Sequence, residues 1–399
     1  MVTRRTLLVG TAGLMASSLL VGCGRNPEAL RVTLLEGAIP PEVLQSFRKQ
    51  VETPVSFTTL PQIQGIFQAL QRWQQMPEEV PPFWRQWLPG AQAAEIPLAD
   101  NLVSLGDYWL KDAIAQNLIE PLVLPEEIWE RLPVEWQQFV SRDDKGLVAT
   151  SDSTELKLWA APYKAQSLVI VYRQSQFPQS DAQSPFQSWR DLLAPELRQR
   201  IALPDHPNLG IGLLQKLETG SFNTSFSSRV NSSASIPQLV QSLSDELSVP
   251  FSQFNRQVKT YDAGNGLKSL INEDVDIVIA WSSDVITALR RYQDLRAVVP
   301  AEGSLLSTDL WVQPKGTTLS QAAKAWIAFC WTAGAATQLS VSGRGISPTF
   351  LGNESELPEA LSQSLLVGDA LKNSEPLLTL PEAMQSAYVS LWRQLRTSA

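Results

Sequence analysis

The apolar residues of this chain fall into short continuous runs typical of buried strands, separated by stretches with helical spacing. Residues 30–35 and 54–59 are strand-like, and Val43, Leu44 and Phe47 between them share one helical face. Such a β-α-β unit predicts parallel strands joined by a right-handed crossover. The same pattern predicts strands at 102–105, 168–172, 200–203, 276–281, 295–299 and 309–312. It predicts helices at 62–74, from 189, and at 210–217, 236–246, 265–272, 282–293, 319–339 and much of 359–397.

One stretch, residues 157–173, reads K-L-W-A-A-P-Y-K-A-Q-S-L-V-I-V-Y-R. Its second half is a β-branched apolar run that suits a strand buried on both faces. Its first half contains Pro162, which donates no backbone hydrogen bond and fits at an edge, a bend or a crossing. We therefore interpret this stretch as the first crossing between two lobes.

The length of 399 residues favours two lobes over one core. Alternating strands and helices predict an α/β fold with two parallel-rich mixed sheets joined by hinge crossings. A net charge of −8 without clustered basic residues argues against nucleic acid as a partner. Residues 141–154 suggest a polar surface loop, and the five prolines within 76–97 suggest an irregular covering segment.

The first residues have the form of an export signal, with a basic start and a modest apolar run. Leu20-Val21-Gly22-Cys23 resembles a lipobox, which implies cleavage after residue 22 and a lipid on Cys23. Arg4 and Arg5 fit either a twin-arginine or a Sec signal. We expect a monomer on the periplasmic side of the cytoplasmic membrane, attached only through this lipid.

Five predicted turns carry an acid beside the end of a strand, where open α/β sheets bind ligands. They are Glu36, Asp107, Asp205, Asp284 and Asp309. Carboxylates there repel an anion and suit a cation, although Asp is also a common helix N-cap. The aromatic residues Tyr108, Tyr163 and Trp281 lie near such turns and could contact an ammonium group.

Enzyme chemistry has little support in the sequence. His206 is the only histidine and stands in a turn beside Asp205 and Pro207. A catalytic triad or a common metal site would depend on it alone. No glycine-rich phosphate loop is present, so we expect no catalytic residues, no cofactor and no metal.

The order of several motifs resembles the substrate-binding proteins of ABC importers, in particular the spermidine/putrescine-binding type. These motifs are L-R-V-T-L-L-x-G-x-I-P-P-E-V-L, A-P-Y-K-A-Q-S-L-V-I-V-Y-R, W-R-D-L-L, R-I-A-L-P-D, D-I-V-I-A-W and P-A-E-G leading to Asp309. The resemblance implies a two-lobed periplasmic-binding-protein fold of type II that closes on its ligand like a hinge. It implies lobe 1 at 23–163 with 304–350, lobe 2 at 164–303 with 351–399, and crossings near 160–168, 300–308 and 348–356.

The resemblance also implies a ligand set for a cationic, polyamine-like solute passed to an ABC permease. Asp309 would bind an ammonium group, Trp281 and Tyr108 would pack the carbon chain, Asp205 or Glu36 would take a second amine, and Tyr163 would lie at the cleft floor. Other positions of the family's cage carry Leu35, His206, Leu209, Ser307 and Ile346 instead. Two alternatives stay open: a lipoprotein with this fold that lost transport and acts as an assembly partner, and an exported hydrolase.

Overall fold

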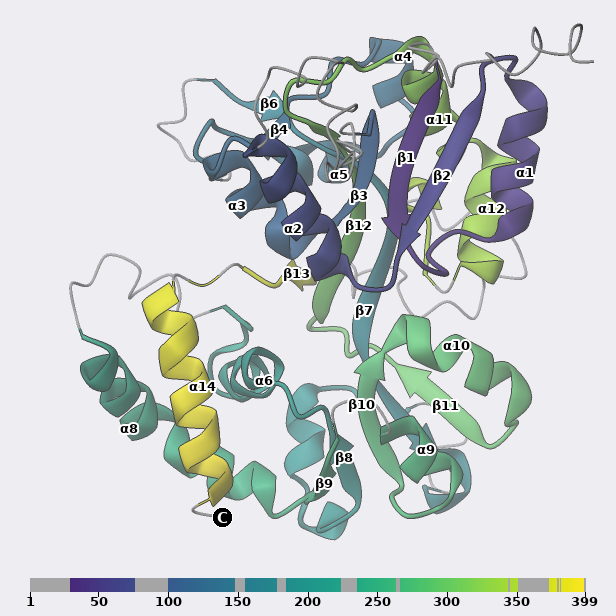
Figure 1. Ribbon diagram of the computed structural model, residues 1–399. Coiled ribbons are helices and arrows are strands. Elements are labelled where there is room, and N and C mark those ends of the chain that lie inside the picture. Colours follow the sequence, from purple (N-terminus) through teal and green to yellow (C-terminus); the bar gives the residue numbers. More distant parts are fainter. Residues whose placement is uncertain are drawn as a thin grey trace, which may run out of the picture.

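The computed structural model describes residues 29–75, 100–147, 155–177, 184–223, 235–262, 266–343, 345–350, 373–378, 380 and 382–397. The predicted leader, Cys23 and the proline-rich stretch 76–97 lie outside the described residues. The molecule has two lobes, drawn one above the other in Figure 1. We call the lobe with β1, β2 and β3 the upper lobe and the lobe with β8, β9 and β10 the lower lobe.

The strands are β1 Leu30–Leu35, β2 Val55–Leu60, β3 Leu102–Gly106, β4 Ile119–Glu120, β5 Ser141–Arg142, β6 Lys157–Leu158, β7 Ala161–Arg173, β8 Ile201–Leu203, β9 Val258–Tyr261, β10 Ile277–Trp281, β11 Leu295–Val298, β12 Leu305–Pro314 and β13 Glu375–Pro376. The α-helices are α1 Pro41–Gln50, α2 Ile63–Gln74, α3 Leu110–Ala115, α4 Glu126–Trp129, α5 Val134–Val140, α6 Pro207–Thr219, α8 Ile236–Asn255, α9 Gly266–Ile271, α10 Ser282–Arg291, α11 Gln321–Cys330, α12 Ala333–Ser342 and α14 Glu382–Thr397. Short 3₁₀ turns include Asp107–Trp109 and Trp189–Leu193.

The strands form a mixed sheet in the order β2-β1-β3-β12-β7-β10-β8-β9, and this confirms the predicted α/β class. The flanks of the sheet are parallel, as the β1-α1-β2 unit predicts. Its centre is antiparallel, because β7 pairs with β12 and with β10 in that sense. Two lobes are thus connected through the middle of one continuous hydrogen-bonded path.

Strand β7 is shared between the lobes. Its first half, up to Ser167, pairs with β12, and its second half, from Leu168, pairs with β10. The change of partner falls at the stretch that the sequence marks as a crossing. Ser304 stabilises this point, because its hydroxyl donates to the Leu168 carbonyl at 2.5 Å. Pro162 is tolerated in the strand where the β7–β12 register shifts, between Asp309 and Leu310.

The buried side chains form clusters on both sides of this shared strand. In the upper lobe, Phe47, Trp311 and Trp326 lie in one cluster under α1 and α11. In the lower lobe, the amphipathic helices α6, α8 and α14 pack together, with Trp392 among their buried residues. In Figure 1 α14 lies between α8 and α6, and it contacts both.

Two predicted helices differ in detail from the structure. The predicted helix 319–339 is two helices, since Thr332 accepts a hydrogen bond from Ala335 N and caps a second helix, α12. The predicted helix 282–293 begins at Ser282, but Ser282 is its first helical residue and does not cap it. The Ser282 hydroxyl accepts a hydrogen bond from Ser167 N in β7, and Trp281 takes the cap position.

Other differences concern local hydrogen bonding. Ser141–Arg142 forms a short antiparallel pair with Lys157–Leu158, within a region that the sequence assigns to a loop. The segment from Trp189 is a 3₁₀ turn closed by a capping box of Ser188 and Asp191, not an α-helix. Strands β9 and β13 were not predicted, because each is short and lacks a clear apolar period.

Candidate functional site

The centre of the crossing strands carries a salt bridge. Lys164 on β7 and Asp309 on β12 are cross-strand partners, so their side chains share one face of the sheet. Lys164 Nζ lies 2.8 Å from Asp309 Oδ2, and the side chains are 11% and 14% exposed. Gly345 makes room for the lysine, since a Cβ there would lie 2.5 Å from Lys164 Cγ. The acid predicted to bind an ammonium group is therefore paired with an internal one.

A second carboxylate, that of Asp107, lies at the carboxyl end of β3. Asp107 follows Gly106, which is the cross-strand partner of Asp309 on β12. Tyr108 N donates to Asp107 Oδ1 at 3.0 Å, whereas Oδ2 is covered and has no hydrogen-bond partner among the described residues. Burial raises the Asp107 pKa to about 7 and outweighs backbone hydrogen bonds from Thr308 and Tyr108, which lower it; the negative charge of Asp309 adds to the rise. A buried oxygen without a donor is costly, so this carboxyl group is suited to a ligand that supplies one.

Arg142, in β5, and Asp107 line one cavity, and Arg142 lies across it from Asp107. Its guanidinium donates to the Ser141 carbonyl at 2.9 Å and lies 5.7 Å from the centre of the Phe139 ring. The indole of Trp159 donates to the Arg142 carbonyl at 3.1 Å and fixes the backbone. Burial lowers the Arg142 pKa to about 10, and the nearby Asp107 carboxylate opposes this change.

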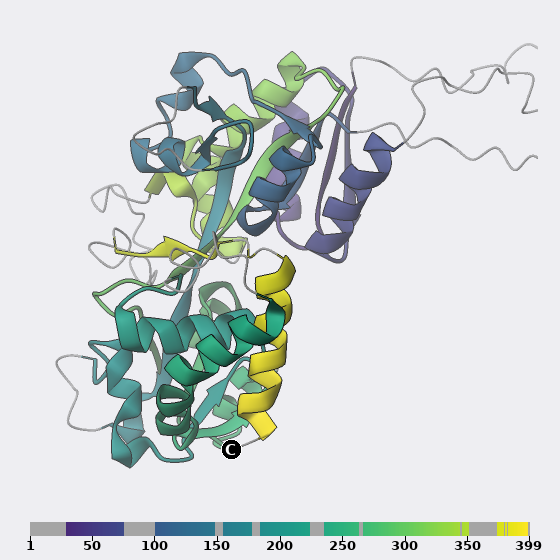
Figure 2. The same ribbon diagram turned by 90° about the vertical axis from the view of Figure 1, so that its left-hand side faces the viewer.

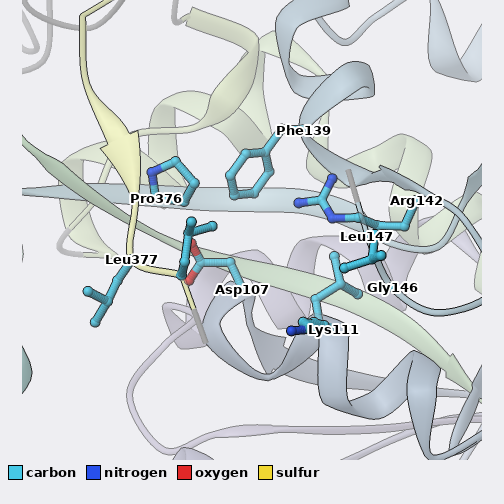
Figure 3. Close-up of a pocket in the computed structure, with 10 residues that line it drawn as sticks. Asp107, Lys111, Phe139, Arg142, Gly146, Leu147, Pro376 and Leu377 are labelled. Carbon is cyan, nitrogen blue, oxygen red and sulfur yellow. The ribbon is translucent and has the colours of Figure 1, made fainter. Parts of the chain in front are cut away.

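The cavity between these groups has a volume of about 120 Å³. It is lined by Asp107, Leu110, Lys111, Phe139, Arg142, Gly146, Leu147, Pro376, Leu377 and Leu378. Figure 3 shows Asp107 and Arg142 from the upper lobe, with Pro376 and Leu377 entering from the segment that carries β13. This volume is close to that of cavities that hold a benzene-sized molecule, so it fits a compact solute better than an extended one.

The residues 373–378, which we call the crossing segment, form one wall of the cavity. In both overall views this segment lies between the lobes (Figures 1 and 2). Its strand β13 pairs in parallel with Leu305 and Leu306 of β12. Gly303 permits this approach, because it has a φ of 83° and a Cβ there would lie 2.0 Å from the Asn373 carbonyl oxygen.

Glu375 attaches the crossing segment to the lower lobe. Its carboxylate accepts hydrogen bonds from Ser221 Oγ at 2.8 Å, Phe222 N at 2.6 Å and Asn223 Nδ2 at 2.8 Å. Asn223 also donates to the Pro376 carbonyl at 2.9 Å and accepts from Leu378 N at 3.1 Å. The cavity therefore has walls from the upper lobe and a wall that is fixed to the lower lobe.

Three of the predicted ligand residues lie near the crossing strands or the facing ends of the lobes. Asp309 is next to Asp107 and bound to Lys164. Tyr108 contacts the lower lobe, since its hydroxyl is hydrogen bonded to the Asn208 side chain. Trp281 ends β10 and is partly buried against the lower-lobe cluster.

The other three predicted ligand residues have different surroundings. Asp205 Oδ1 accepts hydrogen bonds from Trp392 Nε1 at 2.9 Å and from Arg396 Nη1 at 2.7 Å, so it holds α14. Glu36 lies in the exposed turn after β1. Tyr163 has no exposed surface; its hydroxyl is 2.7 Å from Ser104 Oγ and its ring stacks on Trp311. These contacts give Asp205 and Tyr163 structural roles. None of the six predicted ligand residues is among those that line the cavity.

The sequence contained a signal for Asp107, which follows a predicted strand as the other acids do. It contained no comparable signal for Arg142 or for the crossing segment. Arg142 stands in a polar stretch that suggested a loop, and the crossing segment lies far along the chain in a region without a strand pattern. Among the described residues, no three His, Cys, Asp or Glu side chains gather closely enough to hold a metal ion.

Comparisons with known proteins agree with this architecture. The family model described as bacterial extracellular solute-binding protein matches residues 97–368. A search among curated proteins gives no match. No helix in the described part of the chain has the length and apolar character needed to cross a membrane.

Solved structures show a similar fold at low sequence identity. The spermidine/putrescine ABC transporter substrate-binding protein PotD from Streptococcus pneumoniae has a TM-score of 0.68 at 19% identity, covering 93% of this chain and 99% of its own. A putative spermidine/putrescine ABC transporter protein from Listeria monocytogenes has a TM-score of 0.58 at 20% identity, with 93% and 100% covered. The Tp0655 (TpPotD) lipoprotein of Treponema pallidum has a TM-score of 0.59 at 13% identity, with 92% and 99% covered.

Proposed function

The chain belongs to the bacterial extracellular solute-binding proteins of ABC importers, and from this premise we propose that it delivers a small solute with a positively charged amino group to an ABC permease. The sequence predicts a polyamine-like cation. The proposal retains its ammonium group and does not require a polyamine. The observation that carries it is Asp107 Oδ2, a covered oxygen of a cavity-lining residue for which the described residues provide no hydrogen-bond donor. An ammonium group would supply both the missing hydrogen bond and a compensating charge.

The cavity wall includes residues attached to each of the two lobes, and this suggests how a solute would bind. Asp107 belongs to the upper lobe, and the crossing segment is held by Glu375 to the lower lobe. A solute in this cavity would contact both, and so would favour the arrangement in which the lobes are together. We propose that this closed form is what the permease recognises. The lobe boundaries and crossings expected from the sequence belong to this proposal, as do export through either signal type and a lipid on Cys23.

A thermal-shift screen of the mature chain tests the function. The probes are putrescine, spermidine, propylamine and β-alanine, with sucrose and sulfate as solutes without an amine. A ligand at a hundred times its Kd should add about 2.7 kcal/mol to the free energy of unfolding. Asp107→Asn should remove the shift, and Asp112→Asn, an acid on α3 that does not line the cavity, should keep it. A shift with sucrose or sulfate and none with any amine would overturn the proposal.

A second candidate function has one observation in its favour. The internal Lys164–Asp309 pair neutralises the acid that the resemblance assigns to the ligand. A lipoprotein that kept the fold but serves as an assembly partner would need no such acid. Absence of any shift with every solute, in a chain that unfolds cooperatively, would favour this candidate.

A further inference from the structure

We infer that the solute is a compact zwitterion, with its ammonium group at Asp107 and an anionic group, such as a carboxylate, at Arg142. The inference rests on the proposed function and narrows it from amines in general to amino-acid-like solutes. It comes from three properties of the cavity: the charges of its lining, the way Arg142 is held, and its size.

The lining charges do not suit a solute that carries only positive charge. Among the described residues that line the cavity, Lys111 and Arg142 are basic and Asp107 is acidic. Because the Asp107 pKa is raised to about 7, this acid carries less than a full negative charge near neutral pH. A solute with several ammonium groups would place them beside like charges, whereas a solute with one group of each sign would find a partner for both.

Arg142 is built into the cavity wall rather than extended into solvent. The residue is 9% exposed, and its guanidinium lies beside the Phe139 ring. Within the described part of the chain, its guanidinium donates through Nη1 to the Ser141 carbonyl. A guanidinium has five N–H donors in a planar fork that matches a carboxylate, so donors remain for an anionic group. In Figure 3 the guanidinium lies beside Phe139 and across from Asp107.

The size and the remaining walls limit the middle of the solute. A volume of about 120 Å³ leaves room for few atoms between the two charged groups. Leu110, Phe139 and Leu377 supply apolar contacts along the sides. A short carbon chain between an ammonium and a carboxylate fits these walls, and a long chain with an ammonium at each end does not.

The test compares three probes of nearly equal size: β-alanine, propylamine and propionate. β-Alanine carries both charged groups, and each of the others carries one. Binding of each probe to the mature wild-type chain is measured by isothermal titration calorimetry at low salt. We expect β-alanine to bind at least about 10-fold more tightly than propylamine or propionate. A hydrogen bond to a charged group raises affinity by about 10- to 100-fold.

Two variants separate the ends of the site. Arg142→Gln should weaken β-alanine about 10- to 100-fold and leave propylamine within about twofold. Arg131→Gln is the matched control, because this exposed guanidinium of the same lobe donates to the Ala328 carbonyl away from the cavity. Asp107→Asn should weaken both β-alanine and propylamine.

The outcomes distinguish the zwitterion inference from the proposed amine-binding function on which it rests. Equal affinity for propylamine and β-alanine, or no effect of Arg142→Gln on β-alanine, would overturn the zwitterion and leave an amine-binding protein. Tighter binding of propionate than of either amine would overturn the amine at Asp107 and with it the proposed function. If none of the three probes, putrescine or spermidine binds, both are overturned.

Discussion

Lys164 Nζ lies 2.8 Å from Asp309 Oδ2 in the middle of the strands that join the two lobes. The two residues are cross-strand partners, so the backbone register itself brings them together. Both side chains are more than four-fifths covered, so their charges must compensate each other. A cationic solute that used Asp309 would first have to displace an ammonium group that belongs to the protein.

Removing this lysine should destabilise the fold. In Lys164→Met the Asp309 carboxylate is left covered and unpaired, which costs about 3 kcal/mol in comparable buried pairs. The double variant Lys164→Met/Asp309→Asn should recover at least half of that loss, since neither position then carries a charge. Urea unfolding of the wild type, both single variants and the double variant measures the coupling. Additive effects would show that the pair contributes nothing specific.

A glycine pair in α6 tests how closely α14 is packed. A Cβ at Gly210 would lie 2.2 Å from the Trp392 ring, whereas a Cβ at Gly212 would have its nearest contact at 3.4 Å. We expect Gly210→Ala to lower the free energy of unfolding by about 1–3 kcal/mol, because the ring must move. Gly212→Ala should be neutral or stabilising by up to about 1 kcal/mol, because alanine favours the helix. Equal effects of the two changes in a urea titration would contradict this packing.

The part of the fold that the sequence predicts well depends on local patterns. The run around residues 168–172 reads as a buried strand from its composition, and Pro162 marks the crossing because of its own covalent geometry. The strand at 309–312 was found but underestimated, since β12 begins at Leu305 with residues of mixed polarity. Periodicity identifies the centre of an element more reliably than its ends.

The candidate site was harder to predict because its residues meet only through long-range contacts. Asp107 follows β3, Arg142 lies in β5, and the third wall of the cavity comes from residues 376–378. Asp205 had the same position after a strand as Asp107, yet its partners Trp392 and Arg396 lie near the end of the chain. A single sequence does not distinguish an acid that meets a ligand from one that meets another helix.

Asp205→Asn separates these two roles. If Asp205 serves to hold α14, the change weakens its contacts with Arg396 and Trp392 and lowers stability by about 1 kcal/mol. The shift produced by a bound amine should be unchanged, since Asp205 does not line the cavity. Thermal unfolding with and without the amine gives both quantities. Loss of the amine-induced shift at unchanged stability would instead place Asp205 in the ligand site.

The Asp107 carboxyl group should make stability depend on pH. Its folded-state pKa of about 7 lies above the ordinary value for an aspartate, so the folded chain keeps this proton to higher pH than the unfolded chain does. The contribution is fully present below about pH 4 and is lost as pH rises through 7. Relative to Asp107→Asn, the ligand-free wild type should therefore lose stability between pH 4 and 7, by at most about 1.4 kcal/mol per pH unit. A constant difference between the two chains, measured by urea unfolding at several pH values, would exclude this shift.

Glu375 provides the last test, because it connects the cavity wall to the lower lobe. Glu375→Gln keeps the shape of the side chain but removes the charge that Phe222 N and Ser221 Oγ approach. Loosening of the crossing segment should weaken an amine that binds in the cavity by about 10-fold, with a smaller effect on the unfolding of the ligand-free chain. Titration calorimetry and urea unfolding measure the two effects separately.

The chain offers a close control for this change in Glu302. Its carboxylate also accepts hydrogen bonds from a backbone N–H and a serine hydroxyl, those of Trp189 and Ser188. Unlike Glu375, however, it does not belong to the segment whose residues line the cavity. Glu302→Gln should therefore lower stability to a similar degree and leave the affinity unchanged. If both variants weaken binding equally, the effect reflects general loosening of the lower lobe. A selective effect of Glu375→Gln means that the solute binds only where the crossing segment is held, because the segment completes the cavity from the opposite lobe.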